Sequence, residues 1–119
     1  MLERYGCFGG AITTVGMETL AWYRYEGTNE SEGIGIEMER RAAAMGGTVK
    51  WPYNDSECLD ADFFKVVADH LVREAGIRPI LHCYAVDVIF EEGSKRLKGI
   101  VTDMNNAGGS AGEMAGILG

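Results

Sequence analysis

The stretch Met1-Leu-Glu-Arg-Tyr-Gly-Cys-Phe-Gly-Gly10 decides how the rest of the chain is interpreted. An apolar residue leads into the acidic Glu3, the basic Arg4 follows, and the paired glycines Gly9 and Gly10 come a few positions later. This order is typical of a strand end followed by a loop that wraps a ligand, because glycines let backbone N–H groups approach a ligand with no Cβ in the way.

In dinucleotide-binding folds, an acidic residue at the end of the second strand accepts hydrogen bonds from ribose hydroxyls. It follows about 20 residues after a Gly-x-Gly-x-x-Gly turn that holds the pyrophosphate. Glu3 has the character of that acid, but only Met1 and Leu2 precede it, and the turn is absent. We therefore expect either that the sequence begins inside a larger fold or that these residues serve another purpose.

The net charge of −7 restricts the class of partner. Binding to nucleic acids or anionic membranes normally rests on clustered Lys and Arg side chains, and the sequence has no such cluster. No apolar run approaches the roughly 20 residues that cross a bilayer, and no secretion leader is visible. We expect one domain's worth of globular sequence, with no nucleic-acid and no membrane partner.

The three cysteines, Cys7, Cys58 and Cys83, stand at wide and unequal spacing. This pattern is neither a disulfide framework nor a paired zinc motif, so we expect reduced thiols in a cytoplasmic protein. His70 and His82 have no further ligand spaced to join them. We expect structural or surface roles for both and no metal site.

Two segments have helical periodicity. The first runs from residue 34 to the glycine pair Gly46-Gly47, with Glu37 and Arg41 four apart on its polar side. The second runs from Asp60, a good N-cap, to Ala75, before the stop at Gly76. The predicted apolar stripes are Ile34, Met38, Ala42 and Met45 in the first helix, and Phe64, Val67, Ala68, Leu71 and Ala75 in the second.

Strand-forming residues dominate the later part of the chain. Residues 80–90 predict a strand, 91–96 a polar turn around Gly93-Ser94, and 97–102 a second strand that completes a hairpin. The predicted core comprises Phe64, Val67, Leu71, Leu81, Val86, Val88 and Ile100. Residues 105–119 are rich in Gly and Ala, so we expect a flexible tail after a folded part spanning residues 1–104.

The remaining segments are less sharply patterned. Residues 11–15 predict a helical turn opened by the glycine pair, and residues 26–33 a polar loop. Residues 19–25 are compatible with a strand or a short helix, and residues 48–53 predict a short extended segment weakened by Pro52.

The string Glu-Arg-Tyr-Gly-Cys-Phe-Gly-Gly-Ala at residues 3–11 resembles FAD-dependent oxidoreductases with the glutathione-reductase-type fold. The resemblance is greatest to a bacterial family of FAD-dependent oxidoreductases distantly similar to the fumarate reductase flavoproteins. It continues in the same order through both helices and the hairpin, over about 100 residues. It implies an α/β fold (α+β as an isolated piece). This would be a partial FAD-binding Rossmann-like domain that lacks its first βα unit, with two main helices and a C-terminal hairpin.

The resemblance also implies a set of cofactor-binding residues. Glu3 would match the ribose-binding acid and Arg4 the residue on the adenine side. Gly9 and Gly10 would follow the pyrophosphate and flavin, and the backbone of Val86 would contact adenine. The family's later Ala-Thr-Gly-Asp segment is missing, as is the phosphate-binding turn. We therefore expect FAD in the parent family and flavin-mediated redox chemistry on a small molecule there. For this chain alone, we expect no tight FAD binding and no activity.

An alternative of another class is a free-standing small α/β module without redox activity. An unpaired sheet edge or uncovered helix faces would favour self-association, so this alternative predicts a homo-oligomer.

Overall fold

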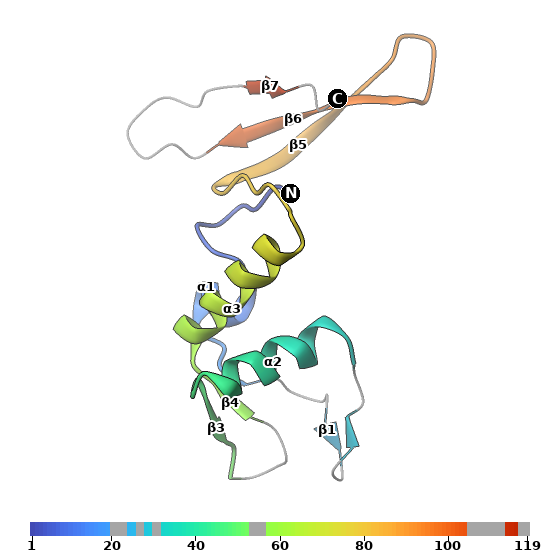
Figure 1. The fold of residues 1–119 in the computed structure, drawn as a ribbon. Helices are drawn as coiled ribbons and strands as arrows, with labels where there is room; N and C mark the ends of the chain where they lie inside the picture. Colours follow the sequence, from blue (N-terminus) through green and yellow to red (C-terminus); the bar gives the residue numbers. More distant parts are fainter. Residues whose placement is uncertain (20–23, 26–27, 30–31, 53–56, 105–113, 117–119) are drawn as a thin grey trace. The chain divides into compact units, whose positions relative to one another are not determined.

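The computed structural model describes residues 1–19, 24–25, 28–29, 32–52, 57–104 and 114–116 (Figure 1). The chain divides into two compact units. Unit 1 comprises Met1–Gly6 and Arg78–Gly119, and unit 2 is the continuous segment Cys7–Ile77. The elements are, in chain order, α1 (Ala11–Val15), β1 (Arg24–Tyr25), β2 (Thr28–Asn29), α2 (Ile34–Ala44), β3 (Thr48–Lys50), β4 (Glu57–Leu59), α3 (Ala61–Glu74), β5 (Cys83–Phe90), β6 (Leu97–Met104) and β7 (Met114–Gly116).

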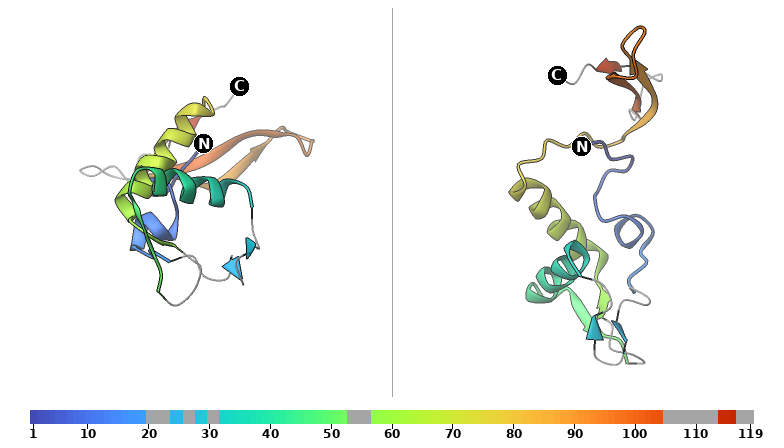
Figure 2. Two further views of the ribbon diagram at one scale, coloured as in Figure 1. Left: turned by 60° about the horizontal axis from the view of Figure 1, so that its bottom comes forward. Right: turned by 90° about the vertical axis from the view of Figure 1, so that its right-hand side faces the viewer.

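In the residues that the structure describes, unit 2 contains three helices and two small antiparallel sheets, β1–β2 and β3–β4. The helices α2 and α3 lie side by side, as both views of Figure 2 show, and their buried side chains share one apolar cluster. Met38 and Leu71 pack against this cluster from positions that remain partly exposed. The cluster itself consists of Ile12, Ala42, Leu59, Phe64 and Val67.

Helix α3 begins and ends where the sequence predicts. One carboxylate oxygen of Asp60 accepts hydrogen bonds from the backbone N–H groups of Asp62 (2.8 Å) and Phe63 (3.2 Å), which would otherwise lack partners. At the other end Gly76 has a φ of 65°, and the Ile77 N–H donates to the Val72 carbonyl at 3.1 Å. This is a Schellman motif, which needs a left-handed residue after the helix.

Helix α2 has the predicted bounds but a different buried face. Ile36, Glu39 and Ala42 are buried, whereas Ile34 is 69% exposed and Met45 is 42% exposed. The predicted stripe is therefore wrong at both ends. Helix α2 meets the cluster through Ala42, which is fully buried because its short side chain allows close approach. That contact turns Ile36 and Glu39 inward and leaves Ile34 outside. Ala75, which the prediction placed on the apolar face of the second helix, follows the last residue of α3 and is likewise exposed.

Unit 1 is built on the predicted hairpin. Strands β5 and β6 pair antiparallel, and β7 pairs with the other side of β6. Leu2 and Ile80 form a parallel bridge, so residues at the start of the chain run alongside the segment that leads into β5. The Rossmann-like arrangement inferred from the resemblance stays a prediction.

The predicted burial of the hairpin is wrong at two positions. Val86 is 53% exposed and Val88 is 44% exposed, while Leu81 and Ile100 are half-buried. The described part of unit 1 contains no helix, so none of its described segments covers a face of the sheet with a helix. Strand propensity predicts the strands correctly, but it does not reveal whether another layer covers them.

Of the tail, the structure describes only Met114–Gly116, which pair with Ile100–Thr102 of β6. Residues 105–113 and 117–119 lie outside the described residues, so the expected flexibility there stays a prediction. Within residues 19–25, Arg24–Tyr25 form a strand, and Thr19 makes an isolated bridge to Cys58. The predicted polar loop contributes the partner strand Thr28–Asn29.

Candidate functional site

The backbone of Glu3 is fixed in unit 1 by its neighbours across the parallel bridge. Its N–H donates to the Ile80 carbonyl, and its carbonyl accepts from the Cys83 N–H, both at 2.9 Å. Next along the chain, the Tyr5 carbonyl accepts from the His82 N–H at 3.2 Å. These bonds join segments nearly 80 residues apart in sequence and place Glu3 beside the start of β5.

The Glu3 carboxylate makes one hydrogen bond to the backbone and keeps further acceptor positions open. Its Oε1 accepts a hydrogen bond from the Tyr5 backbone N–H at 2.9 Å. An ionised carboxylate has about four acceptor positions, so one such bond leaves capacity for two ligand hydroxyls. Glu3 is half-buried, which keeps part of the group open to solvent.

Arg4 lies against aromatic rings of the same unit. Its guanidinium carbon is 5.0 Å from the centre of the Tyr84 ring and 5.9 Å from that of Tyr5, both within the range of a cation–π interaction. Among the described residues, no carboxylate lies within ion-pair distance of Arg4. Its N–H donors therefore remain available.

Val86 occupies a β-bulge. Ala85 pairs with Thr102 and Asp87 pairs with Val101, so Val86 is an extra residue without a partner in the ladder. A bulged residue leaves the regular hydrogen-bonding pattern of its strand, and bulges are common beside functional sites. The side chain of Val86 is exposed.

Gly9 and Gly10 belong to unit 2, where they open α1. A Cβ at Gly9 would overlap the side chain of Thr13 and lie 3.3 Å from Phe64, so packing alone explains this glycine. The Thr13 hydroxyl donates to the Phe8 carbonyl at 2.7 Å and closes the loop around it. Gly10 has a φ of 62°, and a Cβ at this position would meet nothing within 4 Å, so Gly10 borders open space.

The sequence-predicted site residues thus fall into two groups. The structure brings Glu3, Arg4 and Val86 into unit 1, and it assigns Gly9 and Gly10 to unit 2.

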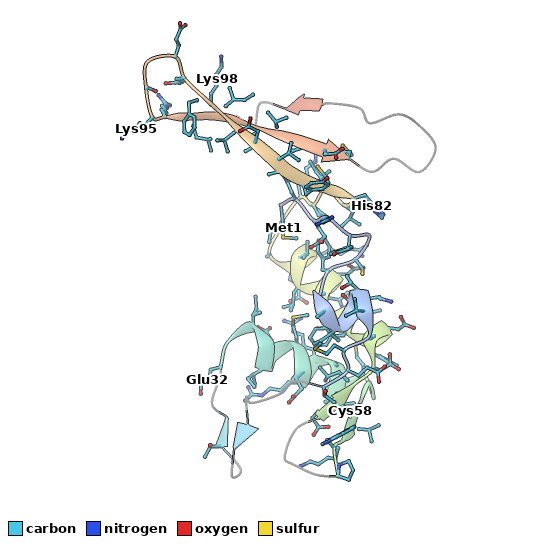
Figure 3. The ribbon with its side chains drawn as sticks, turned by 180° about the vertical axis from the view of Figure 1, so that it is seen from behind. Met1, Glu32, Cys58, His82, Lys95 and Lys98 are labelled. Carbon is cyan, nitrogen blue, oxygen red and sulfur yellow. The ribbon has the colours of Figure 1, made fainter. Side chains whose placement is uncertain are left out.

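His82, at the start of β5 (Figure 3), has a left-handed φ of 52°. Its ring lies so near Gly6 that a Cβ there would be 2.8 Å from two ring atoms. The side chain of His82 is exposed, and its expected structural or surface role stays a prediction.

Sequence reasoning missed Tyr84 and Asp103, whose side chains are joined by a hydrogen bond of 2.9 Å from the tyrosine hydroxyl to the carboxylate. The bond with Asp103 and that residue's charge raise the pKa of the Tyr84 phenol, while Arg4 acts in the opposite direction. A hairpin folded symmetrically about the predicted turn at Gly93-Ser94 pairs position 84 with position 103, as observed. This symmetry about the predicted turn could have identified Tyr84 and Asp103 as a pair from the sequence.

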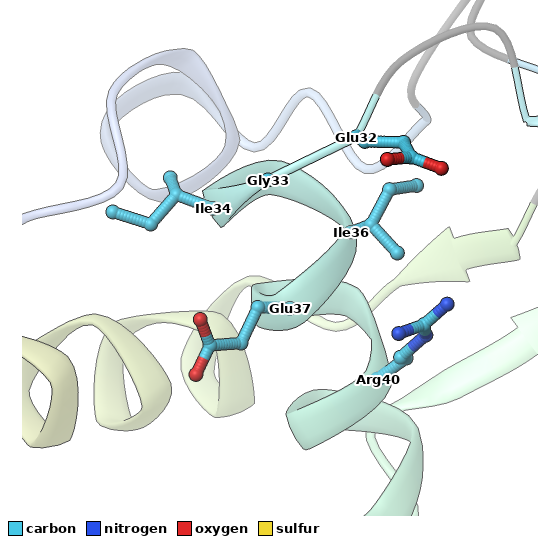
Figure 4. A pocket seen from close by; sticks show the side chains of 6 residues that line it. All are labelled: Glu32, Gly33, Ile34, Ile36, Glu37 and Arg40. Carbon is cyan, nitrogen blue, oxygen red and sulfur yellow. The ribbon is translucent and has the colours of Figure 1, made fainter.

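A hollow of about 440 Å³ lies at the start of α2 in unit 2 (Figure 4). Its polar groups are two carboxylates and one guanidinium, so the charges are mixed and favour no single class of ligand. The lining residues are Glu32, Gly33, Ile34, Ile36, Glu37 and Arg40. A smaller hollow, of about 210 Å³, lies beside β3 and β4.

Metal binding requires several ligating side chains close together, and a membrane crossing requires a long apolar helix. In the described part of the chain, no three His, Cys, Asp or Glu side chains gather as metal ligands would. None of the helices described combines the length and the apolar character that a membrane crossing requires. Cys7, Cys58 and Cys83 are all free thiols.

Comparisons with known proteins show to which family the chain belongs. A search of curated proteins and a search of solved structures both found no match. The family model described as FAD dependent oxidoreductase matches residues 1–115, which is nearly the whole sequence. The match agrees with the resemblance carried by residues 3–11 and by the order of helices and hairpin behind it. The chain therefore belongs to the FAD dependent oxidoreductase family.

Proposed function

We propose that unit 1 binds the adenosine end of FAD. In this proposal the Glu3 carboxylate accepts hydrogen bonds from the ribose hydroxyls, and Arg4 and the backbone of Val86 contact the adenine. Gly9 and Gly10 follow the pyrophosphate and flavin. The observation that carries the proposal is that the first three residues, chosen from the sequence alone, fall in one unit and each retains an unused polar group or an irregular backbone.

The residues fit an adenosine group by their chemistry. Glu3 offers free acceptor positions to hydroxyl donors, and Arg4 offers N–H donors to ring nitrogens. The bulge at Val86 removes one residue of β5 from the ladder with β6, so its backbone is available to a base edge. The open space beside Gly10 suits a loop that passes close to a ligand.

When bound, FAD supplies hydride or electron transfer, and the protein supplies binding and orientation. Glu3, Arg4 and Val86 hold the end of the cofactor remote from the flavin, so they orient it without touching the reacting atoms. We take the parent fold to be of the glutathione-reductase type and the substrate to be a small molecule. The three free thiols support a cytoplasmic location.

Affinity for FAD in this chain should be weak. The 119 residues contain no Gly-x-Gly-x-x-Gly turn, and in such folds that turn and the helix behind it hold the pyrophosphate with backbone donors and the helix dipole. An adenosine group held by Glu3, Arg4 and strand backbone alone lacks those contacts. We therefore propose that the chain by itself is inactive.

Nuclear magnetic resonance titration of the whole chain tests the site directly. Millimolar AMP should shift the amide signals of Glu3, Arg4 and Val86, whereas FMN, which has no adenosine, should not. Glu3→Ala should weaken the AMP response, and Glu92→Ala, at an exposed turn position of the same unit, should leave it intact. Absence of any AMP response in unit 1 would overturn the adenosine site.

Flavin fluorescence tests the weak affinity. Purified protein should carry no flavin, and titration of FAD at micromolar protein should leave its fluorescence unchanged. Tight FAD binding that disappears in Glu3→Ala would overturn the weak affinity and the inactivity while supporting the site.

A second candidate function is self-association without redox chemistry. It is favoured by the apolar side chains that the hairpin exposes, among them Phe90 at 52% and Leu97 at 55%. It is also favoured by the outer edge of β5, which lies at the end of its sheet and, beyond Cys83, pairs with no other described strand. Exposed edges and apolar faces favour pairing with a second copy. Light scattering over a range of concentrations decides this: a monomer throughout would overturn the candidate.

A further inference from the structure

Tyr84 and Asp103 form a fixed pair on one face of the β5–β6 sheet. They are direct partners in the antiparallel register, so their side chains emerge from the same face. The Tyr84 hydroxyl donates to the Asp103 carboxylate at 2.9 Å. Both side chains are half-buried. The ring of Tyr84 is thereby held at its backbone end by the ladder and at its hydroxyl end by a charged acceptor, and such hydrogen bonds are the stronger kind.

The guanidinium of Arg4 lies over the ring of Tyr84. The guanidinium carbon lies 5.0 Å from the ring centre, closer than it lies to the ring of Tyr5. Among the described residues the Arg4 guanidinium makes no hydrogen bond or ion pair, so its contact with the ring does not occupy its N–H donors. Tyr84 therefore restrains the orientation of Arg4 without consuming the donors that a ligand would use.

We propose that Tyr84 and Asp103 are positioning residues that orient Arg4 toward the adenine of the bound nucleotide. The inference rests on the adenosine site of the proposed function and adds to it two residues that the sequence resemblance does not supply. Asp103 acts through Tyr84, and Tyr84 acts through Arg4. A long, flexible arginine side chain loses rotamer freedom when it is fixed, and a ring that fixes it before the ligand arrives spares the ligand that loss.

The pKa of Tyr84 reports on the contacts of Tyr84 with Asp103 and Arg4, and measuring it needs no ligand. Asp103, by its hydrogen bond and its charge, raises that pKa, and Arg4 lowers it. With ¹³C-labelled tyrosine, the Tyr84 signal can be assigned by its loss in Tyr84→Phe. Its pKa should fall in Asp103→Asn and rise further in Arg4→Leu. A Tyr84 pKa indifferent to Arg4→Leu would show that the guanidinium is not held over the ring, which overturns the proposal.

Nucleotide affinity then tests the consequence. Tyr84→Leu should weaken AMP binding by about two- to fivefold, the range for an exposed cation–π contact. Tyr84→Phe keeps the ring and loses the hydroxyl, so it should lie between Tyr84→Leu and the unmodified chain. Phe90→Leu, which removes an exposed aromatic ring from the same strand, is the matched control and should leave AMP binding unchanged. Thermal unfolding of each variant checks that the fold is retained.

The outcomes separate the two levels of the proposal. No AMP binding by the unmodified chain overturns the adenosine site together with this inference. AMP binding that is weakened by Glu3→Ala but unaffected by Tyr84→Leu overturns the positioning role alone. AMP binding weakened in Tyr84→Leu and retained in Phe90→Leu supports it.

Discussion

The backbone of Gly47 lies directly against the side chain of Phe63. A Cβ placed on Gly47 would overlap the Phe63 Cβ and lie 2.6 Å from its Cγ. These atoms are attached close to the backbone of α3, so rotation of the ring cannot move them away. The contact places the end of α2 against the first turn of α3, and it depends on the absence of a side chain at position 47.

Gly47→Ala should therefore destabilise the protein by about 1–3 kcal/mol, the usual range for overpacking a tight contact. Urea denaturation measures the change in the free energy of unfolding. Gly35→Ala, in the first turn of α2, is the control, because its new Cβ meets nothing within 4 Å and alanine is the better helix former, so it should not destabilise the protein. Equal effects from the two substitutions would contradict the close contact.

Asp60→Ala should destabilise α3 by about 1 kcal/mol, because the N–H groups of Asp62 and Phe63 lose their acceptor. Asp60→Asn keeps an acceptor oxygen and should recover most of the loss. The comparison with Asp69→Ala, in the middle of the same helix, separates capping from loss of a charge. A destabilisation of the same size in Asp69→Ala would count against the cap.

Glu39 makes stability depend on pH. Burial, and secondarily the charge of Glu57, raises its pKa from 4.5 to about 6, although Arg40 partly opposes the shift. Between these pH values the native state binds more protons than the unfolded state. The free energy of unfolding should therefore fall as pH rises from about 4.5 to about 6, by roughly 2 kcal/mol at most.

Glu39→Gln should abolish this fall and be the more stable protein at pH 7, as measured by urea denaturation at several pH values. Glu32→Gln, at an exposed position of the same unit, should retain the fall. A slope that persists in Glu39→Gln would assign the effect to another group.

Arg41 links the two long helices. Its guanidinium lies 2.6 Å from the Glu37 carboxylate on α2 and 2.7 Å from that of Glu74 on α3. Arg41→Met should lower the urea midpoint at low salt, and the difference should shrink in 1 M NaCl, where the screening length is about 3 Å. Arg73→Met, which removes an arginine of α3, is the control variant for the loss of one positive charge. An effect of Arg41→Met that is independent of salt would point to lost packing instead.

Local signals in the sequence predict the elements well. The cap at Asp60, the glycines after both long helices and the turn at Gly93-Ser94 each act through the conformation of a few neighbouring residues, and the structure confirms them. Burial is different, since it depends on which layer covers an element. The exposed Ile34, Val86 and Val88 show that apolar character alone does not determine it.

The candidate site likewise contains residues that the sequence predicts and contacts that it does not predict. Similarity of sequence supplied Glu3, Arg4 and Val86, but the bulge at Val86 depends on a register slip between strands, which periodicity does not reveal. The link from Arg4 to Tyr84 joins residues 80 positions apart and depends on the parallel bridge at Leu2. Residues brought together in this way are visible only after the chain has folded.

The bridge between Leu2 and Ile80 also sets an order of events during synthesis. Unit 2 is one continuous segment, so all of its contacts, including those of the cluster that joins Ile12 to Phe64 and Val67, can form once that segment has left the ribosome. Unit 1 has to wait, because Met1–Gly6 emerge long before their partner segment exists. Closing so long a loop is slow, and these residues stay without their partner until then. A nascent chain long enough for Ile77 to have left the ribosome should therefore already contain the helices, while Glu3 and Arg4 acquire their neighbours only when the hairpin is made.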